Sequence, residues 1–117
     1  MNASDALPLT PVVFHILLAL ADGERHGYAI AQEAERVSGG RVRMGPGTLY
    51  GSIQRVVDAG FIRETFPRTA SAENERRRYY ALTALGRRVL EAEAARLSAL
   101  VALAEARGVV APAPRTA

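Results

Sequence analysis

Apolar residues recur at intervals of three and four in four stretches of this 117-residue chain, which is the spacing of one face of an α-helix. The first stretch begins at Thr10, a hydroxyl residue that can cap a helix and is followed by proline, and it stops at Gly23. The second runs from about His26 to Val37 and ends at a Ser-Gly-Gly sequence. Two helices are therefore expected before the middle of the chain.

The third stretch predicts a helix with two different faces. Pro46 suits its first turn, and Gly60 suits the left-handed residue that often follows the end of a helix. One face carries the core stripe Leu49, Ile53, Val56 and Val57. The opposite face is mostly polar and carries Thr48, Tyr50, Gly51, Gln54, Arg55 and Asp58.

Two β-prone runs follow, over residues 61–66 and 77–82, and the polar stretch between them predicts a hairpin. Thr83 then caps a last helix of about 24 residues, which at ~1.5 Å per residue is roughly 36 Å long. The order predicts a mainly α fold with a small β-hairpin, a winged helix-turn-helix. We expect this DNA-binding domain at residues 10–82, a dimerisation helix at 83–107, and disordered tails at 1–9 and 108–117.

The last helix carries an apolar seam whose members alternate by four and three, as in helices that associate. The expected dimer-interface residues are the seam members Leu90, Ala94, Leu97, Val101 and Ala104, with Val89, Leu100 and Leu103 widening the seam. A helix folded back on its own domain would show the same pattern. Self-association is favoured, because the helix is long and the domain can form only a modest core.

Positive charge is concentrated in one part of the chain. Residues 41–90 have a net charge of +6, whereas the remainder has a net charge of −3. The whole chain therefore has a net charge of +3, and all of its basic residues are arginine. A basic segment that coincides with the third helix and the hairpin is an electrostatic pattern typical of nucleic-acid binding.

Other kinds of chemistry lack support. There is no cysteine, and neither His15 nor His26 has a second ligand at metal-binding spacing, so no cofactor or metal is expected. No nucleophile with its base and no phosphate loop is found, so the chain is not expected to be an enzyme. The apolar run at residues 12–21 is too short to span a bilayer, and no secretory signal precedes it. A cytoplasmic protein with no membrane partner is expected.

A polar helix followed by a basic hairpin can place the helix in a major groove of DNA and the hairpin along neighbouring phosphates. The candidate DNA-binding residues are Tyr28, Arg41, Arg43, Gly47, Thr48, Tyr50, Gly51, Gln54, Arg55, Arg76, Arg77 and Arg78. Thr48 and Gln54 are the candidates for reading bases, and Tyr50 and the arginines for contacting phosphates.

Each assignment has an alternative from ordinary packing or solvation. Tyr28 could belong to the core, and Thr48 and Gln54 could lie on a solvated helix face. Arg76 is the best wing contact, whereas one of Arg77 and Arg78 is expected to pair with Glu64 across the hairpin.

Four short motifs in order add a resemblance. They are His26-Gly27-Tyr28-x-Ile30, Gly47-x-Leu49-Tyr50-x-x-Ile53, Asp58-Ala59-Gly60-Phe61-Ile62 and Arg78-Tyr79-Tyr80-x-Leu82-Thr83-x-x-Gly86. Together they make the chain similar to the PadR family of bacterial transcriptional regulators, over about residues 10–107.

The resemblance implies a homodimer that binds inverted-repeat operator DNA, usually as a repressor. Many family members release DNA when a small molecule is sensed, so an unidentified effector is a further expected partner. The alternative is a winged helix used for protein–protein contact, which would present an apolar or acidic third helix.

Overall fold

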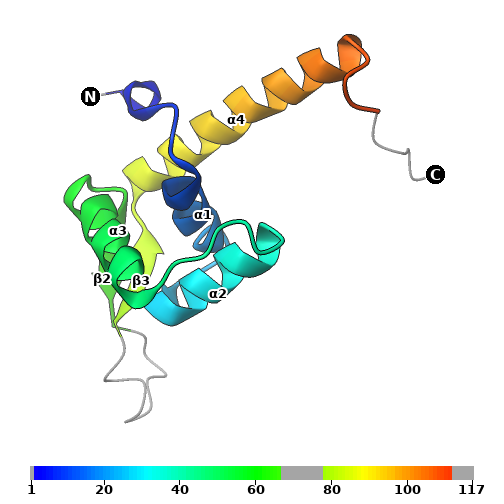
Figure 1. Ribbon diagram of the computed structural model, residues 1–117. Helices are drawn as coiled ribbons and strands as arrows, with labels where there is room; N and C mark the ends of the chain where they lie inside the picture. The colour runs from blue at the N-terminus through cyan, green and yellow to red at the C-terminus, as the bar shows by residue number, and fades with distance from the viewer. Residues whose placement is uncertain (1, 67–77, 112–117) are drawn as a thin grey trace.

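The computed structural model describes residues 2–66 and 78–111, and it has the expected mainly helical architecture with a small sheet (Figure 1). In chain order the elements are the 3₁₀ turn η1 (Ala3–Ala6), α1 (Pro11–Ala19), β1 (Arg25–His26), α2 (Gly27–Val37), α3 (Pro46–Asp58), β2 (Ile62–Thr65), β3 (Tyr79–Leu82) and α4 (Ala84–Ala106). The first three helices and the strands form one body, from which α4 extends (Figure 1).

The helices begin and end near the predicted positions because the expected capping residues act there. The Thr10 hydroxyl accepts a hydrogen bond from the backbone N–H three residues later, and Pro46 occupies the first turn of α3. Gly60 has a φ of +83°, the left-handed conformation that glycine adopts without steric cost. An additional cap was not predicted: Nδ1 of His26 accepts the Ala29 N–H at 3.1 Å and begins α2.

The predicted hairpin is present, and it belongs to a three-stranded antiparallel sheet in the order β1-β3-β2. β2 pairs with β3 so that Ile62 lies opposite Leu82 and Thr65 lies opposite Tyr79. The short β1 was not predicted, because two residues are too few to show a strand periodicity. It ties the loop before α2 to β3, the second strand of the wing. The stretch between the hairpin strands, residues 67–77, lies outside the described residues.

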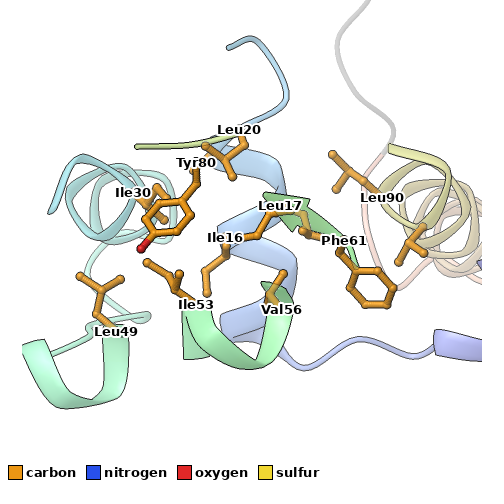
Figure 2. Close-up of a cluster of buried hydrophobic side chains, with 13 residues drawn as sticks. Ile16, Leu17, Leu20, Ile30, Leu49, Ile53, Val56, Phe61, Tyr80 and Leu90 are labelled. Carbon is orange, nitrogen blue, oxygen red and sulfur yellow. The ribbon is translucent and has the colours of Figure 1, made fainter. Parts of the chain in front are cut away.

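The core lies where α1, α2, α3 and the sheet meet (Figure 2). The predicted stripe of α3 faces it, with Leu49, Ile53 and Val56 buried and Val57 partly buried. The side chains labelled in Figure 2 come from α1 and the residue that follows it, from α2, α3, β3 and α4, and from the turn before β2: Ile16, Leu17, Leu20, Ile30, Leu49, Ile53, Val56, Phe61, Tyr80 and Leu90. This core fixes α3 with its opposite face outward.

The first half of α4 belongs to this same core, which corrects part of the expected dimer seam. Val89 is fully buried and Leu90 is only 6% exposed, both within the single chain. These two residues were expected at a dimer interface, but their side chains have almost no surface left for a partner. The cause is that the first turns of α4 lie against α1 and β3.

The start of α4 is held unusually close to the turn before β2. The Thr83 hydroxyl caps the helix by accepting the Gly86 N–H at 3.0 Å, and it donates to the Gly60 carbonyl. The backbone N–H of Thr83 also donates to the Phe61 carbonyl at 3.0 Å. A Cβ on Gly86 would lie 1.8 Å from that carbonyl oxygen, so only glycine fits there.

The N-terminal segment is ordered, which corrects the expectation that residues 1–9 form a disordered tail. Apolar residues of the segment, including Leu7 and Leu9, pack against the core. The Leu9 N–H donates to Oε2 of Glu93 at 2.8 Å, which fastens the segment to α4. Sequence periodicity could not reveal this docking, because the segment is irregular apart from the one 3₁₀ turn.

The expected C-terminal tail begins as an ordered turn. Gly108 has a φ of +72°, and the Val109 N–H donates to the Ala104 carbonyl at 2.9 Å, which closes the end of α4. Residue 1 and residues 112–117 lie outside the described part of the chain.

Candidate nucleic-acid interface

α3 presents a continuous exposed face, because its other side is fixed in the core. Leu49, Ile53 and Val56 hold the buried side. The six candidates on this helix are all exposed: Gly47, Thr48, Tyr50, Gly51, Gln54 and Arg55. Six of the twelve candidates therefore lie on the exposed side of α3, including Thr48 and Gln54, which the sequence assigned to base contacts.

Gln54 is held along the helix by its neighbour one turn later. Its Nε2 donates to Oδ1 of Asp58 at 2.9 Å, and both side chains are exposed. Pairs of this kind at i and i+4 steady a side chain only weakly. Gln54 could therefore turn from Asp58 towards a base at a small cost.

A groove between α2 and the start of α3 is lined by Tyr50 and two further candidates. Tyr28, Arg43 and Tyr50 line a cavity of about 470 Å³. Tyr28 is 62% exposed, so the alternative that it packs in the core is wrong. Its ring lies parallel to that of His26, with 6.5 Å between the ring centres.

The position of Tyr50 depends on a glycine that the sequence analysis did not single out. The ring of Tyr50 covers Gly27 at the first turn of α2, where a Cβ would lie 3.0 Å from Cε1 and 3.1 Å from the hydroxyl oxygen. Tyr50 nevertheless stays 49% exposed. Its ring is thus supported by α2 while part of the side chain reaches solvent. The motif His26-Gly27-Tyr28 carried this signal, but the partner of the glycine is visible only in the fold.

The two arginines before α3 differ in their surroundings. Arg43 forms an ion pair with Glu35 of α2 at 3.2 Å, and its Nε also donates to the Gly40 carbonyl at 3.0 Å. Arg41 is exposed. Glu35 was not among the sequence candidates, and it places a negative charge in the groove that Arg43 shares with the two tyrosines. Any anion bound by Arg43 would compete with this carboxylate.

Arg55 lies on a different side of α3 from this groove. It lines a smaller cavity of about 220 Å³ together with residues of the N-terminal segment, among them Pro8 and Leu9. Arg43 and Arg55 therefore place positive charge beside two different parts of α3.

Of the three wing arginines, only Arg78 lies within the described residues, and it is exposed just before β3. Arg76 and Arg77 fall in the segment that the structure leaves undescribed. Burial raises the pKa of the Tyr80 hydroxyl, and the negative charge of Glu64 raises that pKa further, whereas the Arg78 guanidinium opposes the shift. The ionised form of Tyr50 raises this pKa slightly as well.

Among residues 2–66 and 78–111, no group of three or more His, Asp or Glu side chains is placed to hold a metal ion. Within those same ranges, no helix combines the length and apolarity that are needed to cross a membrane.

Three helices, a wing of two longer strands and an outward polar face on the third helix define a winged helix-turn-helix protein. The chain belongs to the PadR-like family of transcriptional regulators, whose sequence profile matches residues 16–92. This confirms the resemblance drawn from the four motifs.

Solved structures with the same architecture include a PadR family regulator from Clostridium difficile, which is 22% identical with a TM-score of 0.66. The alignment covers 82% of this chain and 96% of that one. RosR from H. salinarum is 28% identical with a TM-score of 0.62, over 93% of this chain and 84% of that one. Bacillus subtilis PadR, solved in complex with operator DNA, is 24% identical with a TM-score of 0.55, over 94% of this chain and 54% of that one.

A protein relative is 45% identical over 89 residues, which are 74% of this chain. It is an uncharacterised 37.1 kDa protein in transposon TN4556 from Streptomyces fradiae. The matched part covers 24% of that protein, so this chain spans about a quarter of the length of the relative.

Proposed function

We propose that this regulator is a homodimer that binds an inverted-repeat operator and represses transcription by occluding a promoter. The observation that carries the proposal is the outward polar face of α3, bordered by the groove of Tyr28, Arg43 and Tyr50. A surface used for protein contact would be apolar or acidic, whereas this one is polar with arginines beside it. The operator complex of B. subtilis PadR supports the same use of the fold. Action on chromosomal DNA would place the protein in the cytoplasm.

In the proposed complex, α3 enters a major groove and the groove residues contact the backbone beside it. Thr48 and Gln54 face base edges, and Gln54 can make a bidentate contact with adenine. The exposed part of Tyr50 and the guanidinium of Arg43 reach phosphates, which fix the register of the helix. Arg55 and the wing arginines extend the positive surface to either side.

The second half of α4 supports the proposed homodimer. Leu100 and Val101 are each 50% exposed and Leu103 is 44% exposed, on the part of α4 that extends from the domain (Figure 1). Burial of a large apolar side chain is worth roughly 1.5–3 kcal/mol as an upper estimate. The remaining seam residues, Ala94, Leu97, Leu100, Val101 and Ala104, are therefore proposed to pack against a second copy.

The assembly can be tested by placing a charge in this seam. Leu100→Glu would bury an unpaired carboxylate at the interface, so light scattering should show mostly monomer. The domain should stay folded, because the side chain of Leu100 lies outside the core. Arg107→Glu, on an exposed residue beyond the seam, serves as the control. A Leu100→Glu protein that stays dimeric would refute this interface.

DNA binding can be tested with the purified protein and its own promoter region. Affinity should fall steeply as salt increases, with a log–log slope of about −0.9 per phosphate neutralised. Gln54→Ala should cost roughly 1–3 kcal/mol on the preferred operator and little on random DNA, because it removes a base contact. Arg43→Ala should weaken binding to both DNAs alike. If the wild-type protein binds neither DNA, or binds with no salt dependence, the proposed function is wrong.

A further inference from the structure

Glu93 is a buried carboxylate that the DNA-binding surface does not use. It lies on α4 and is only 1% exposed. A charged group is buried at high cost unless it is paired and hydrogen-bonded. Glu93 meets both conditions: it accepts hydrogen bonds from Nε of Arg96 at 2.5 Å, from a terminal nitrogen of Arg96 at 3.2 Å, and from the Leu9 N–H at 2.8 Å.

These bonds join two segments that are distant in the sequence. Arg96 lies on the same helix, so its ion pair fixes the carboxylate rather than the fold. The Leu9 N–H belongs to the segment that leads from η1 into α1. η1 itself also lies against α4 (Figure 1). Glu93 therefore fastens the N-terminal segment across α4 as a strap, which we define as residues 2–9.

The position of this attachment along α4 determines how well the direction of the helix is fixed. The other anchors lie at its start: Thr83, Gly86, Val89 and Leu90 hold it to the turn before β2 and to the core. Thr83 to Leu90 spans ~10 Å of helix, and Glu93 extends the anchored length to ~15 Å. From Leu90 to the end of α4 at Ala106 is a further ~24 Å.

A short anchor on a long helix amplifies small movements. A movement of about 1 Å over the ~10 Å anchor would displace the end of α4 by roughly 2.3 Å, whereas the same movement over the longer anchor displaces it by roughly 1.3 Å. The strap thus nearly halves the displacement of the end of α4.

We propose that Glu93 is a positioning residue, which straps the N-terminal segment to α4 and so fixes the angle at which α4 leaves the DNA-binding domain. If α4 holds the dimer together, this angle sets the distance between the two copies of α3, and hence the operator spacing that the dimer accepts. The second consequence rests on the proposed function, whereas the first does not.

The angle can be measured without DNA. Because the chain has no cysteine, two introduced cysteines would be the only sites that a thiol-reactive spin label modifies. Spin labels on Ala59→Cys and Arg107→Cys, diluted into unlabelled protein, would report the distance from α3 to the end of α4. We expect a narrow distance distribution in the otherwise unchanged chain and a clearly broader one with Glu93→Ala. Glu91→Ala, at an exposed position on the same helix, is the matched control and should leave the distribution narrow.

Two further variants separate positioning from a loss of folding. Glu93→Gln keeps an oxygen that can accept the Leu9 N–H, so it should restore most of the narrow distribution. Arg96→Ala frees the carboxylate but keeps that backbone bond, so an intermediate width is expected even if Glu93→Ala fails to fold. The proposal would be overturned if Arg96→Ala and Glu93→Gln both gave distance distributions as narrow as that of the unchanged chain. In that outcome Glu93→Ala would be either equally narrow or unfolded.

The operator consequence is measured with inverted repeats whose spacers differ by single base pairs. We expect the wild-type protein to lose roughly tenfold in affinity when the spacing changes by one base pair, and Glu93→Ala to lose only about two- to threefold. Binding to an isolated half-site should not change. If Glu93→Ala keeps the sharp spacing preference although its labels show a broad distribution, the operator consequence is wrong. If the wild-type protein binds no DNA, the proposed function fails while the label result still stands.

Discussion

The contact between Gly86 and the Phe61 carbonyl makes a strong prediction about stability. Gly86→Ala would place a methyl group 1.8 Å from that oxygen, whereas non-bonded heavy atoms attract best at about 3.5–4.0 Å. The start of α4 would have to move away by more than 1 Å from the turn before β2. We expect the variant to fold less stably, although alanine is the better helix former.

The magnitude follows from the bonds at this contact. Overpacking of a tight site costs about 1–3 kcal/mol. Movement of α4 would also strain the two hydrogen bonds from Thr83 to the Gly60 and Phe61 carbonyls, each worth about 1 kcal/mol. The gain in helix propensity returns about 1 kcal/mol. The net expectation is a loss of roughly 1–4 kcal/mol in the free energy of unfolding.

Thermal and urea unfolding followed by circular dichroism would measure this loss at a fixed protein concentration, because association shifts the apparent stability. Gly51→Ala is the matched control, since Gly51 also lies in a helix but has no atom within 4 Å of its added Cβ. This control should be more stable by about 1 kcal/mol or less. If Gly86→Ala were as stable as the wild-type protein, the close approach of α4 to the Phe61 carbonyl would not exist in solution.

Three further predictions concern the binding surface and the buried carboxylate. Gly27→Ala should push the ring of Tyr50 off α2 and weaken DNA binding, while circular dichroism still shows a folded protein. Unchanged DNA affinity would mean that Tyr50 does not contact DNA. Glu35→Gln should release Arg43 and raise DNA affinity several-fold at low salt, and this increase should fade at high salt. Equal affinity of the variant and the wild-type protein in an electrophoretic shift assay would show that the ion pair with Glu35 does not restrain Arg43. Hydrogen bonds from Arg96 hold the pKa of Glu93 below its usual value. The ionised carboxylate therefore stabilises the fold fully above the unfolded-state pKa near 4.5, and this stabilisation is lost as pH falls through the lower folded-state pKa. Glu93→Gln should therefore narrow the difference in unfolding midpoint between pH 7 and pH 3, and an unchanged difference would contradict the assignment.

The sequence was sufficient to place the helices, because their limits are set by local chemistry. Thr10 and Thr83 cap their helices through hydrogen bonds from N–H groups three residues later, Pro46 suits the first turn of α3, and Gly60 follows that helix in the left-handed conformation. The core stripe of α3 was also predictable, since a period near 3.6 decides which side is buried. These features need no knowledge of distant contacts.

The features that were missed all depend on contacts between distant parts of the chain. Glu93 looked like any other acidic residue of a long helix until the Leu9 N–H was seen beside it. Val89 and Leu90 fit a dimer seam and a domain core equally well, because both environments favour the same apolar spacing. The role of Gly27 beneath Tyr50 likewise depends on how α2 crosses α3. Periodicity shows that a face is buried, but not what buries it.

The division of α4 into a core-bound half and an extended half has a consequence for chains that share a cell. Substitutions at Val89 or Leu90 would unfold the domain, whereas substitutions at Leu100, Val101 or Leu103 change only the surface offered to another copy. If α4 forms the proposed dimer, the choice of pairing partner can therefore change during evolution without altering α3 or the fold. After gene duplication, a few changes of size or charge at these exposed positions would be enough to stop two related regulators from forming mixed pairs.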